Sequence, residues 1–146
     1  MASMQAEAIT ADDEALVAAA RDLINARFRE NRHHIAAAVR TTDGRIYLGL
    51  HLDTYVGRAS VCAEAVAVGS AMADGATGIT AIVSVRHPKP TDPIDGVQIV
   101  SPCGVCREML TDFAPDAHVI MRQGGQLGRF KATDLLPEKY RRKTAP

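Results

Sequence analysis

The chain has 146 residues, of which 47% are hydrophobic and 23% are charged. This length suits one domain with a single core, and the apolar content is that of a globular rather than a disordered protein. The 17 basic residues equal the 17 acidic ones, so the net charge is zero. A neutral chain has no overall field to attract a nucleic-acid polymer. We therefore expect one domain over residues 11–140, with loose termini at 1–10 and 141–146, and no nucleic-acid partner.

The sequence also bears on the compartment. It contains no apolar run of membrane-spanning length, and its first residues lack the basic start and apolar stretch of a secretory signal. It contains three cysteines. In a reducing compartment thiols stay free, bind metal or act as nucleophiles, and their spacing must decide between these roles. We expect a cytoplasmic protein that does not contact a membrane.

The first elements in chain order are a helix and a hairpin. Apolar residues recur at helical spacing from Asp12 or Asp13 to about Glu30, after an acidic start that favours a helix N-terminus. Two apolar runs at 35–39 and 46–52 flank an Asp-Gly pair, which is a strong hairpin signal. This part of the chain therefore predicts one helix followed by two antiparallel strands.

Strands and helices continue to alternate in the rest of the chain. Small and apolar residues predict a helix over Cys62–Asp74, and Pro102 and Ala114-Pro115 bound a second, short helix over Cys103–Phe113. The predicted strands and turns are a buried strand at 79–85, a loop at 87–98, a short apolar run at 97–100, a strand pair at 119–121 and 127–131, and a final turn at 133–136. The alternation predicts an α/β fold, a central sheet with helices on its faces.

The three cysteines lie where these two helices begin. Cys103 and Cys106 are three residues apart, so both thiols face one side of a first helical turn, where the helix dipole favours thiolate. Cys62 begins the other helix, and it joins them if the two N-termini face each other. Three protein ligands leave one tetrahedral position for water, as in a catalytic zinc site. The alternative is three buried thiols that act as small hydrophobes.

Glu64 follows Cys62 by two residues, too close in the chain to be a further ligand without strain. A carboxylate there can take a proton from a zinc-activated water and pass it to a ring nitrogen and to departing ammonia. The alternative is an acidic residue that only stabilises a helix N-terminus. Cys-x-Glu followed by Pro-Cys-x-x-Cys is, however, the all-cysteine form of the zinc deaminase signature.

On these motifs the chain resembles the cytidine deaminase family, and among its members the small tetrameric cytidine deaminases and the blasticidin-S deaminases. The resemblance runs from the Thr-Thr-Asp-Gly-Arg-Ile hairpin to Asp-Leu-Leu-Pro near the end. It implies a three-layer α/β/α fold with a five-stranded mixed sheet and both cysteine-bearing helices on one face. It also implies Zn²⁺ on Cys62, Cys103 and Cys106, Glu64 as proton shuttle, a small-molecule substrate and a homotetramer.

The chain departs from the family pattern where the substrate is held. His51 and Asp53 stand where cytidine deaminases carry Asn-x-Glu to grip ribose, and His33 stands where a stacking Phe is usual. The candidate substrate-binding residues are therefore His51, Asp53 and His33, together with Ala63, which follows Cys62. His51 and Asp53 are equally compatible with a polar strand end, and His33 with a partly exposed strand start, as is its neighbour His34.

A further departure concerns the charge around the metal. The Arg that often follows Cys-Ala-Glu is replaced by Ala65, as it is by an apolar residue in blasticidin-S deaminases. Without it, three thiolates keep more negative charge on the zinc. Arg107 is the candidate compensating residue and could pair with a thiolate, or equally with Glu108 or Asp112.

These observations predict a hydrolytic deaminase of a cytosine-type nucleoside such as cytidine or deoxycytidine, with blasticidin S as the alternative substrate. A non-enzymatic, zinc-stabilised binding protein is the rival hypothesis, against which Glu64 argues. Editing of a base in a polynucleotide would need a basic or aromatic surface. A chain with three Phe, three Tyr, no Trp and no net charge does not favour it.

Overall fold

A computed structural model describes residues 4–143, so the predictions for residues 1–3 and 144–146 lie outside the described residues. The helices and strands, in chain order, are α1 (Ala11–Arg27), β1 (Ile35–Thr41), β2 (Ile46–Leu50), α2 (Ala63–Ala73), β3 (Ile79–Arg86), β4 (Gln98–Val100), α3 (Gly104–Phe113), β5 (His118–Gln123) and β6 (Gln126–Lys131). Short 3₁₀ turns cover Gly57–Ala59 and Ala132–Leu135. Each helix and strand expected from the sequence is present, with ends shifted by a few residues.

The strands form one mixed sheet in the order β2-β1-β3-β5-β6, with β4 paired to the end of β3. Only β3 and β5 are parallel, and the other neighbours are antiparallel. The sheet has six strands rather than the five that the resemblance implied. The additional strand, β4, is three residues long and follows a proline-rich loop, so it adds little to a periodicity signal.

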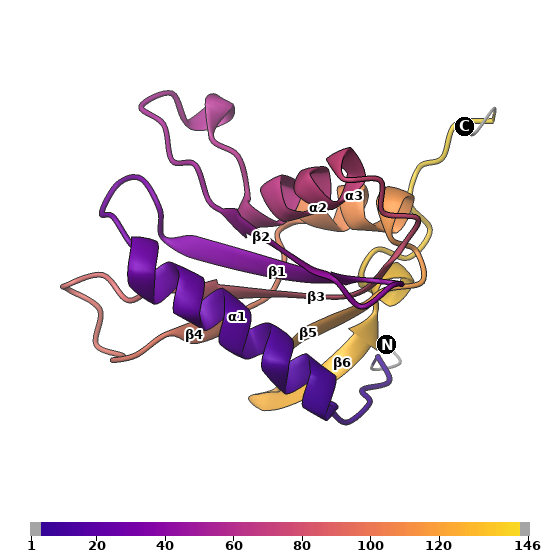
Figure 1. Cartoon of the computed structure of the whole chain (residues 1–146), viewed down its shortest axis with the longest axis horizontal. Helices are drawn as coiled ribbons and strands as arrows, with labels where there is room; N and C mark the ends of the chain where they lie inside the picture. Colours follow the sequence, from indigo (N-terminus) through magenta and orange to yellow (C-terminus); the bar gives the residue numbers. More distant parts are fainter. Residues whose placement is uncertain (1–3, 144–146) are drawn as a thin grey trace.

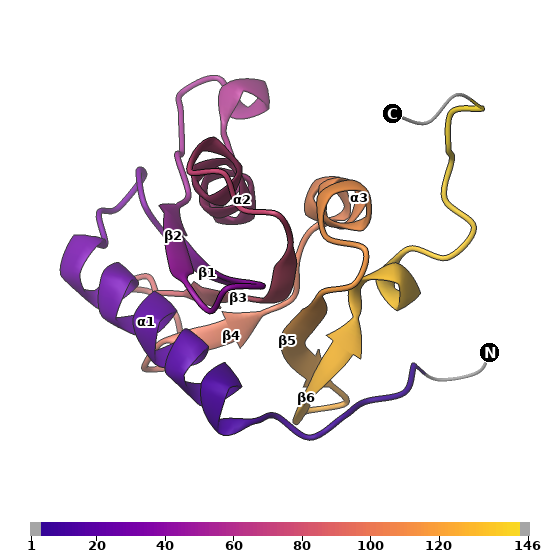
Figure 2. The ribbon, with the colours of Figure 1, turned by 45° about the vertical axis from the view of Figure 1, so that its right-hand side comes forward.

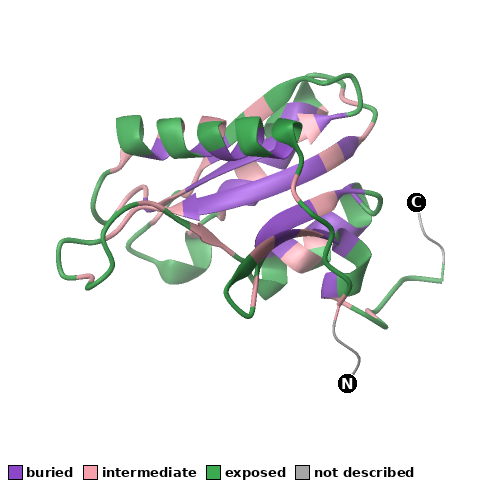
Figure 3. Cartoon of the chain, turned by 90° about the horizontal axis from the view of Figure 1, so that it is seen from below, coloured by how far each residue is buried: buried purple, intermediate pink, exposed green. Residues whose placement is uncertain are grey.

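Helices cover both faces of the sheet, which confirms the three-layer α/β/α architecture. Helix α1 lies on one face, and α2 and α3 lie side by side on the other (Figures 1 and 2). The sheet between them is buried, whereas the outer face of α1 is exposed (Figure 3). Side chains of β1 alternate between the two cores: Ala36 and Ala38 pack under α1, and Ala37 and Val39 pack under α2.

An acidic residue ties α1 to the sheet. Asp13 forms a capping box with Thr10 at the helix N-terminus, as Oδ2 accepts from the Thr10 N–H. Its carboxylate is fully buried and also lies 3.1 Å from Nη2 of Arg40 on β1 and 3.1 Å from Nε of Arg129 on β6. One side chain thus joins the helix to strands from both halves of the sheet.

Glu7 and Lys139, near the two ends of the described chain, are held against the domain. Residues 1–10 were expected to be loose, but Glu7 exchanges two backbone hydrogen bonds of 2.9 Å with Arg129. At the other end, Nζ of Lys139 lies 2.9 Å from Oδ1 of Asp112 and donates to the Glu108 carbonyl on α3. None of the helices in residues 4–143 combines the length and apolar composition needed to cross a membrane.

Candidate active site

The three cysteines meet where α2 and α3 begin. Cys62 is the N-cap residue of α2 and Cys103 that of α3, both in extended backbone conformation, and Cys106 lies in the first turn of α3. Neither N-cap side chain forms a capping hydrogen bond within its helix. Both sulfurs are therefore free to point toward the space between the helices, beside the positive ends of two helix dipoles.

A glycine sets the position of α2. A Cβ atom at Gly49 of β2 would lie 2.4 Å from the carbonyl oxygen of Ala63 and 2.5 Å from the backbone nitrogen of Ala67. Such distances are far below van der Waals contact, so only glycine lets the first turns of α2 rest directly on β2. Because Cys62 and Glu64 belong to this end of α2, the close approach fixes their height above the sheet.

The sulfur atoms are arranged as a metal ligand set. All three lie within 4.8 Å of one another, and Sγ of Cys62 is 3.5 Å from Sγ of Cys103. Thiolates on a tetrahedral zinc, with Zn–S bonds of about 2.3 Å, are separated by about 3.8 Å. The donor set therefore fits zinc in both chemistry and spacing, and its three ligands leave one position open.

The protonation of the thiols depends on their surroundings. Burial, followed by the charge of Glu64, raises the pKa of Cys106 far above its ordinary value, and burial and the hydrogen bond with Cys103 raise the pKa of Cys62. Burial also acts to raise the pKa of Cys103, but the Cys106 and Val105 amides and the neighbouring thiols outweigh it, so this pKa is lowered. Loss of all three protons therefore requires a bound cation.

Glu64 lies against the cysteine cluster. It is in the first turn of α2, its residue is only 5% exposed, and Oε2 lies 3.5 Å from Sγ of Cys106. Ala63 beside it is also buried. A carboxylate that has little access to bulk water and lies next to the ligand set can exchange protons with a molecule bound there.

Arg107 does not contact a thiol. Its Nε donates to the carbonyl of Pro102 at 3.0 Å, and Nη1 donates to the carbonyl of Leu135 at 3.2 Å. The sequence left open a pair with a thiolate, with Glu108 or with Asp112, and the geometry shows a different arrangement: the guanidinium joins the loop before Cys103 to the last 3₁₀ turn. Sequence reasoning could not show this, because the partners are backbone carbonyls and one lies 28 residues away.

The candidate substrate residues lie at the end of the sheet next to the cysteines. Leu52 exchanges backbone hydrogen bonds of 2.9 and 3.0 Å with Val61, which precedes Cys62. His33 and Asp53 line a shallow hollow of about 360 Å³, together with Arg32 and Tyr55. His33 donates through Nδ1 to the carbonyl of His51 at 2.8 Å. The structure thus brings His33, His51 and Asp53 together beside the loop that leads to Cys62.

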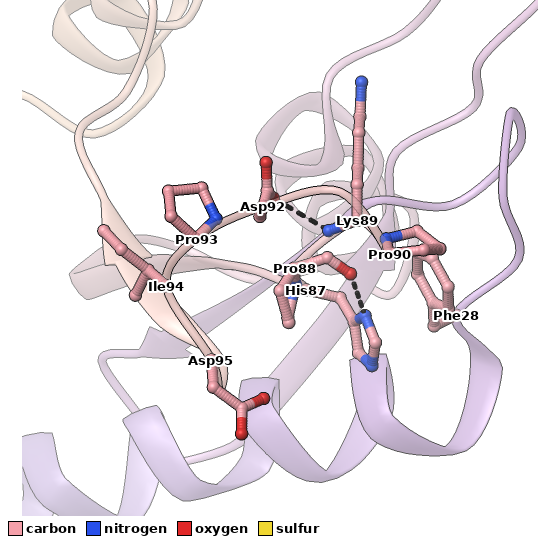
Figure 4. Close-up of a pocket in the computed structure, with 9 residues that line it drawn as sticks. All are labelled: Phe28, His87, Pro88, Lys89, Pro90, Asp92, Pro93, Ile94 and Asp95. Atoms are coloured by element: carbon pink, nitrogen blue, oxygen red, sulfur yellow. Dashed lines mark hydrogen bonds between the residues drawn. The ribbon is translucent and has the colours of Figure 1, made fainter.

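His34 differs from expectation, since the sequence suggested partial exposure and the residue is 6% exposed. The rings of His34 and Phe28 pack edge-to-face, and Phe28 stacks on His87 with ring centroids 3.9 Å apart. Figure 4 shows Phe28 and His87 among the residues lining a second hollow, of about 350 Å³, formed by the loop after β3. Sequence reasoning missed this cluster because its rings come from three segments.

Within residues 4–143, neither hollow is lined by a cysteine or by Glu64.

An α/β/α domain with three thiols and a carboxylate at paired helix N-termini has the architecture of a hydrolytic deaminase. Comparisons with known proteins agree. A sequence model of the family described as cytidine deaminase-like matches residues 9–121. Blasticidin-S deaminase of Bacillus cereus is 41% identical over 134 residues, which cover 92% of this chain and 96% of that protein. The chain therefore belongs to the cytidine deaminase-like family.

A relative and a solved structure that are named cytidine deaminase match the chain at lower identity. The enzyme of Halalkalibacterium halodurans is 27% identical over 112 residues, covering 75% of this chain and 79% of that protein. The crystal structure of cytidine deaminase from Bacillus anthracis superposes with a TM-score of 0.74 at 23% identity, covering 88% of this chain and 89% of that one. The latter likeness establishes the fold. As a member of this generally zinc-dependent family, the chain is a hydrolytic deaminase with a cysteine cluster that can bind a metal.

Proposed function

We propose that this enzyme removes the amino group from the cytosine ring of a small nucleoside-type molecule, using a zinc ion held by Cys62, Cys103 and Cys106. The observation that carries the proposal is the convergence of three sulfurs within 4.8 Å, with the Glu64 carboxylate 3.5 Å from one of them. A purely structural zinc site would more often have a fourth Cys or His in place of a carboxylate beside an open position.

Zinc, when bound, supplies a Lewis acid that activates the attacking water. The chain's own contribution to the proton transfers is Glu64. Its carboxylate accepts one proton from the water, which forms the new bond to the ring carbon that bears the amino group. Glu64 delivers this proton to the neighbouring ring nitrogen. It then moves the remaining proton of the newly added hydroxyl to the amino group, which leaves as ammonia while the carbonyl forms. The product is the uracil-type ring, so that water and substrate balance product and ammonia.

Within cytosine-type nucleosides, we expect blasticidin S to be a better substrate than cytidine or deoxycytidine. The 41% identity to a blasticidin-S deaminase over nearly the whole chain supports this preference. So does the site, because His51 and Asp53 occupy the positions at which the cytidine deaminase pattern carries Asn-x-Glu. We assign substrate contacts to His51, Asp53 and His33, with Ala63 packed beside the ligand.

The assembly that we propose is a cytoplasmic homotetramer. Apolar side chains stay exposed near the site in the single chain: Tyr55 is 94% exposed and Val105 is 75% exposed. Subunit contacts would cover such groups. The cysteines of the described chain form no disulfide, and thiols that serve as metal ligands persist in a reducing compartment.

The test is ammonia release by the zinc-loaded protein from blasticidin S, cytidine and deoxycytidine, with adenosine as the matched control. We expect ammonia from the cytosine compounds alone, in the order given, and about one zinc per chain by metal analysis. Folded, zinc-loaded protein that releases ammonia from none of these compounds would overturn the proposed function in favour of a zinc-stabilised binding protein.

A further inference from the structure

The hydrogen bonding of His34 fixes its tautomer. The backbone N–H of Asn31 donates to Nε2 of His34 at 2.9 Å, in a turn where Asn31 has a φ of 60°. Asparagine tolerates this left-handed conformation better than most residues. Because an amide N–H can only donate, Nε2 must be unprotonated, and a neutral His34 ring carries its proton on Nδ1.

The Nδ1 atoms of His34 and His51 can act as a hydrogen-bond donor and acceptor, respectively. Both are buried, and neither has a hydrogen-bond partner among residues 4–143. The rings lie 6.3 Å apart, centroid to centroid, at 45°. This separation is longer than a direct bond between two imidazoles allows, and one water molecule can bridge it. Since buried polar atoms are almost always paired, we infer a water that accepts from Nδ1–H of His34 and donates to an unprotonated Nδ1 of His51.

The surroundings keep His34 neutral. Burial, followed by the charges of Lys89 and His51, lowers the pKa of His34, and the charge of Arg86 adds to this, while Asp53 opposes it. The rings of Phe28 and His34 pack edge-to-face, and His87, drawn beside Phe28 in Figure 4, stacks on Phe28. The backbone is also held, because the His87 N–H donates to the His34 carbonyl at 2.9 Å. His34 therefore offers one donor in a fixed place.

His51 lies where this donor can act on the substrate site. Its N–H donates to the Ile35 carbonyl, so the strand geometry continues past β2 and places its side chain on the same face as Gly49, beneath α2. With Nδ1 accepting, the His51 proton is on Nε2. This nitrogen is not among the buried unpaired atoms and has no partner in residues 4–143, so it is open to solvent.

We propose that His34 is a positioning residue that holds His51 as an N–H donor toward an oxygen acceptor of the substrate's sugar. The proposed chain of hydrogen bonds runs from Asn31 to the substrate, and its donors are, in order, the Asn31 amide, Nδ1–H of His34 and Nε2–H of His51. The proposal rests on the proposed function, since it assumes that His51 contacts the substrate. It restricts the recognised atom to a ring oxygen, hydroxyl oxygen or carboxylate, and excludes a group that can only donate.

Two substitutions separate this role from a merely structural one. His34→Asn places an amide N–H close to the position of Nδ1 and releases the Asn31 amide, which is exposed and can bind water. His34→Gln reaches the position of Nε2, so it can accept from Asn31 but lacks the donor toward His51. We expect His34→Asn to keep KM within about twofold and His34→Gln to raise KM about tenfold with little change in kcat. His118→Gln, on β5, is the control.

Nitrogen-15 chemical shifts of the histidine rings provide a readout without turnover. We expect the wild type to show His51 protonated on Nε2 and His34 on Nδ1. Equal KM changes in the two variants, no change in either, or His51 protonated on Nδ1 would overturn the inference. If the zinc-loaded wild type deaminates no compound of the panel, the proposed function fails. The nitrogen-15 shifts then test alone whether His34 holds His51 with its proton on Nε2.

Discussion

The carboxylate oxygen Oε2 of Glu64 lies 3.5 Å from the sulfur of Cys106, although the two residues belong to different helices and are 42 positions apart. This contact places a carboxylate at the edge of the proposed ligand set. Metal binding and proton transfer can therefore be tested by different substitutions, because Glu64 can be changed without removing a proposed ligand.

Glu64→Gln keeps the size and a hydrogen bond of the side chain but cannot exchange protons. We expect turnover to fall by about 10² to 10⁴-fold, as is general for the loss of an acid–base group. Zinc content and the melting temperature should stay near those of the wild type. Ammonia release, metal analysis and thermal melting test this; undiminished turnover would contradict the mechanism, and loss of zinc would make Glu64 a ligand.

Serine at Cys103 or at Cys106 should remove the zinc, because a hydroxyl is a poor substitute for a thiolate. The two variants should differ once metal is absent. Cys106 is 1% exposed, whereas Cys103 is exposed, so only Cys106→Ser buries a new polar group. In chelator, we expect Cys106→Ser to be about 1–2 kcal/mol less stable than the metal-free wild type. Cys103→Ser should have the same free energy of unfolding as the metal-free wild type. Denaturant unfolding in chelator measures both differences.

Gly49→Ala tests how α2 is positioned. The added methyl would meet backbone atoms at 2.4 and 2.5 Å, which cannot move without displacing the helix. We expect a loss of about 2 kcal/mol or more, with weaker zinc retention because Cys62 moves with α2. Gly69→Ala is the matched control: it lies in α2 with open space around it, and alanine favours a helix by about 1 kcal/mol. Equal stability of the two variants would refute the argument.

Asp13→Asn should destabilise the fold by about 3 kcal/mol, since it leaves two arginines facing a neutral group. Burial acts to raise the pKa of Asp13, but the Thr10 amide, Arg40 and Arg129 outweigh it, so the pKa lies below 3.8. A lowered pKa stabilises the fold above about pH 4 and loses this effect as the pH falls further. The difference between wild type and variant should therefore shrink below pH 4; a constant difference from pH 7 to pH 3 would argue against the ion pairs.

The proposed assembly predicts the mass of a homotetramer by light scattering at micromolar concentration. Val105→Glu would place a charge on a 75% exposed apolar position between Cys103 and Cys106. If that surface is covered in the assembly, the variant should dissociate and lose activity while single chains stay folded. A wild-type monomer that is fully active would exclude the assembly.

Much of the site follows from local sequence. Cys103 and Cys106 were predicted to be a chelating pair from their spacing and their place at a helix start. Cys62, at the start of the preceding predicted helix, supplied the third sulfur. Capping and periodicity give these positions because a helix N-terminus depends on a few adjacent residues. The Asp-Gly hairpin between β1 and β2 is local in the same way, and the structure has it.

Features that depend on distant segments were beyond the sequence. His34 is buried by Phe28 at the end of α1 and by the loop after β3, so its burial is a property of tertiary packing. Arg107 binds carbonyls brought near by the C-terminal segment, and β4 is too short to show a period. In each case the deciding partner is a backbone group or a ring from elsewhere in the chain.

The sulfurs of Cys62 and Cys103 are 41 residues apart in sequence, and the chain between them forms α2, β3 and β4. In an unfolded chain the Cys103–Cys106 pair is the easier chelate to form, because closing the longer loop to Cys62 carries a further entropic penalty. The third ligand reaches the pair once β4 has joined β3 and α2 has settled on Gly49. If the three cysteines hold zinc as proposed, we expect the third ligand to bind after the sheet has formed, so that folding begins without the ion.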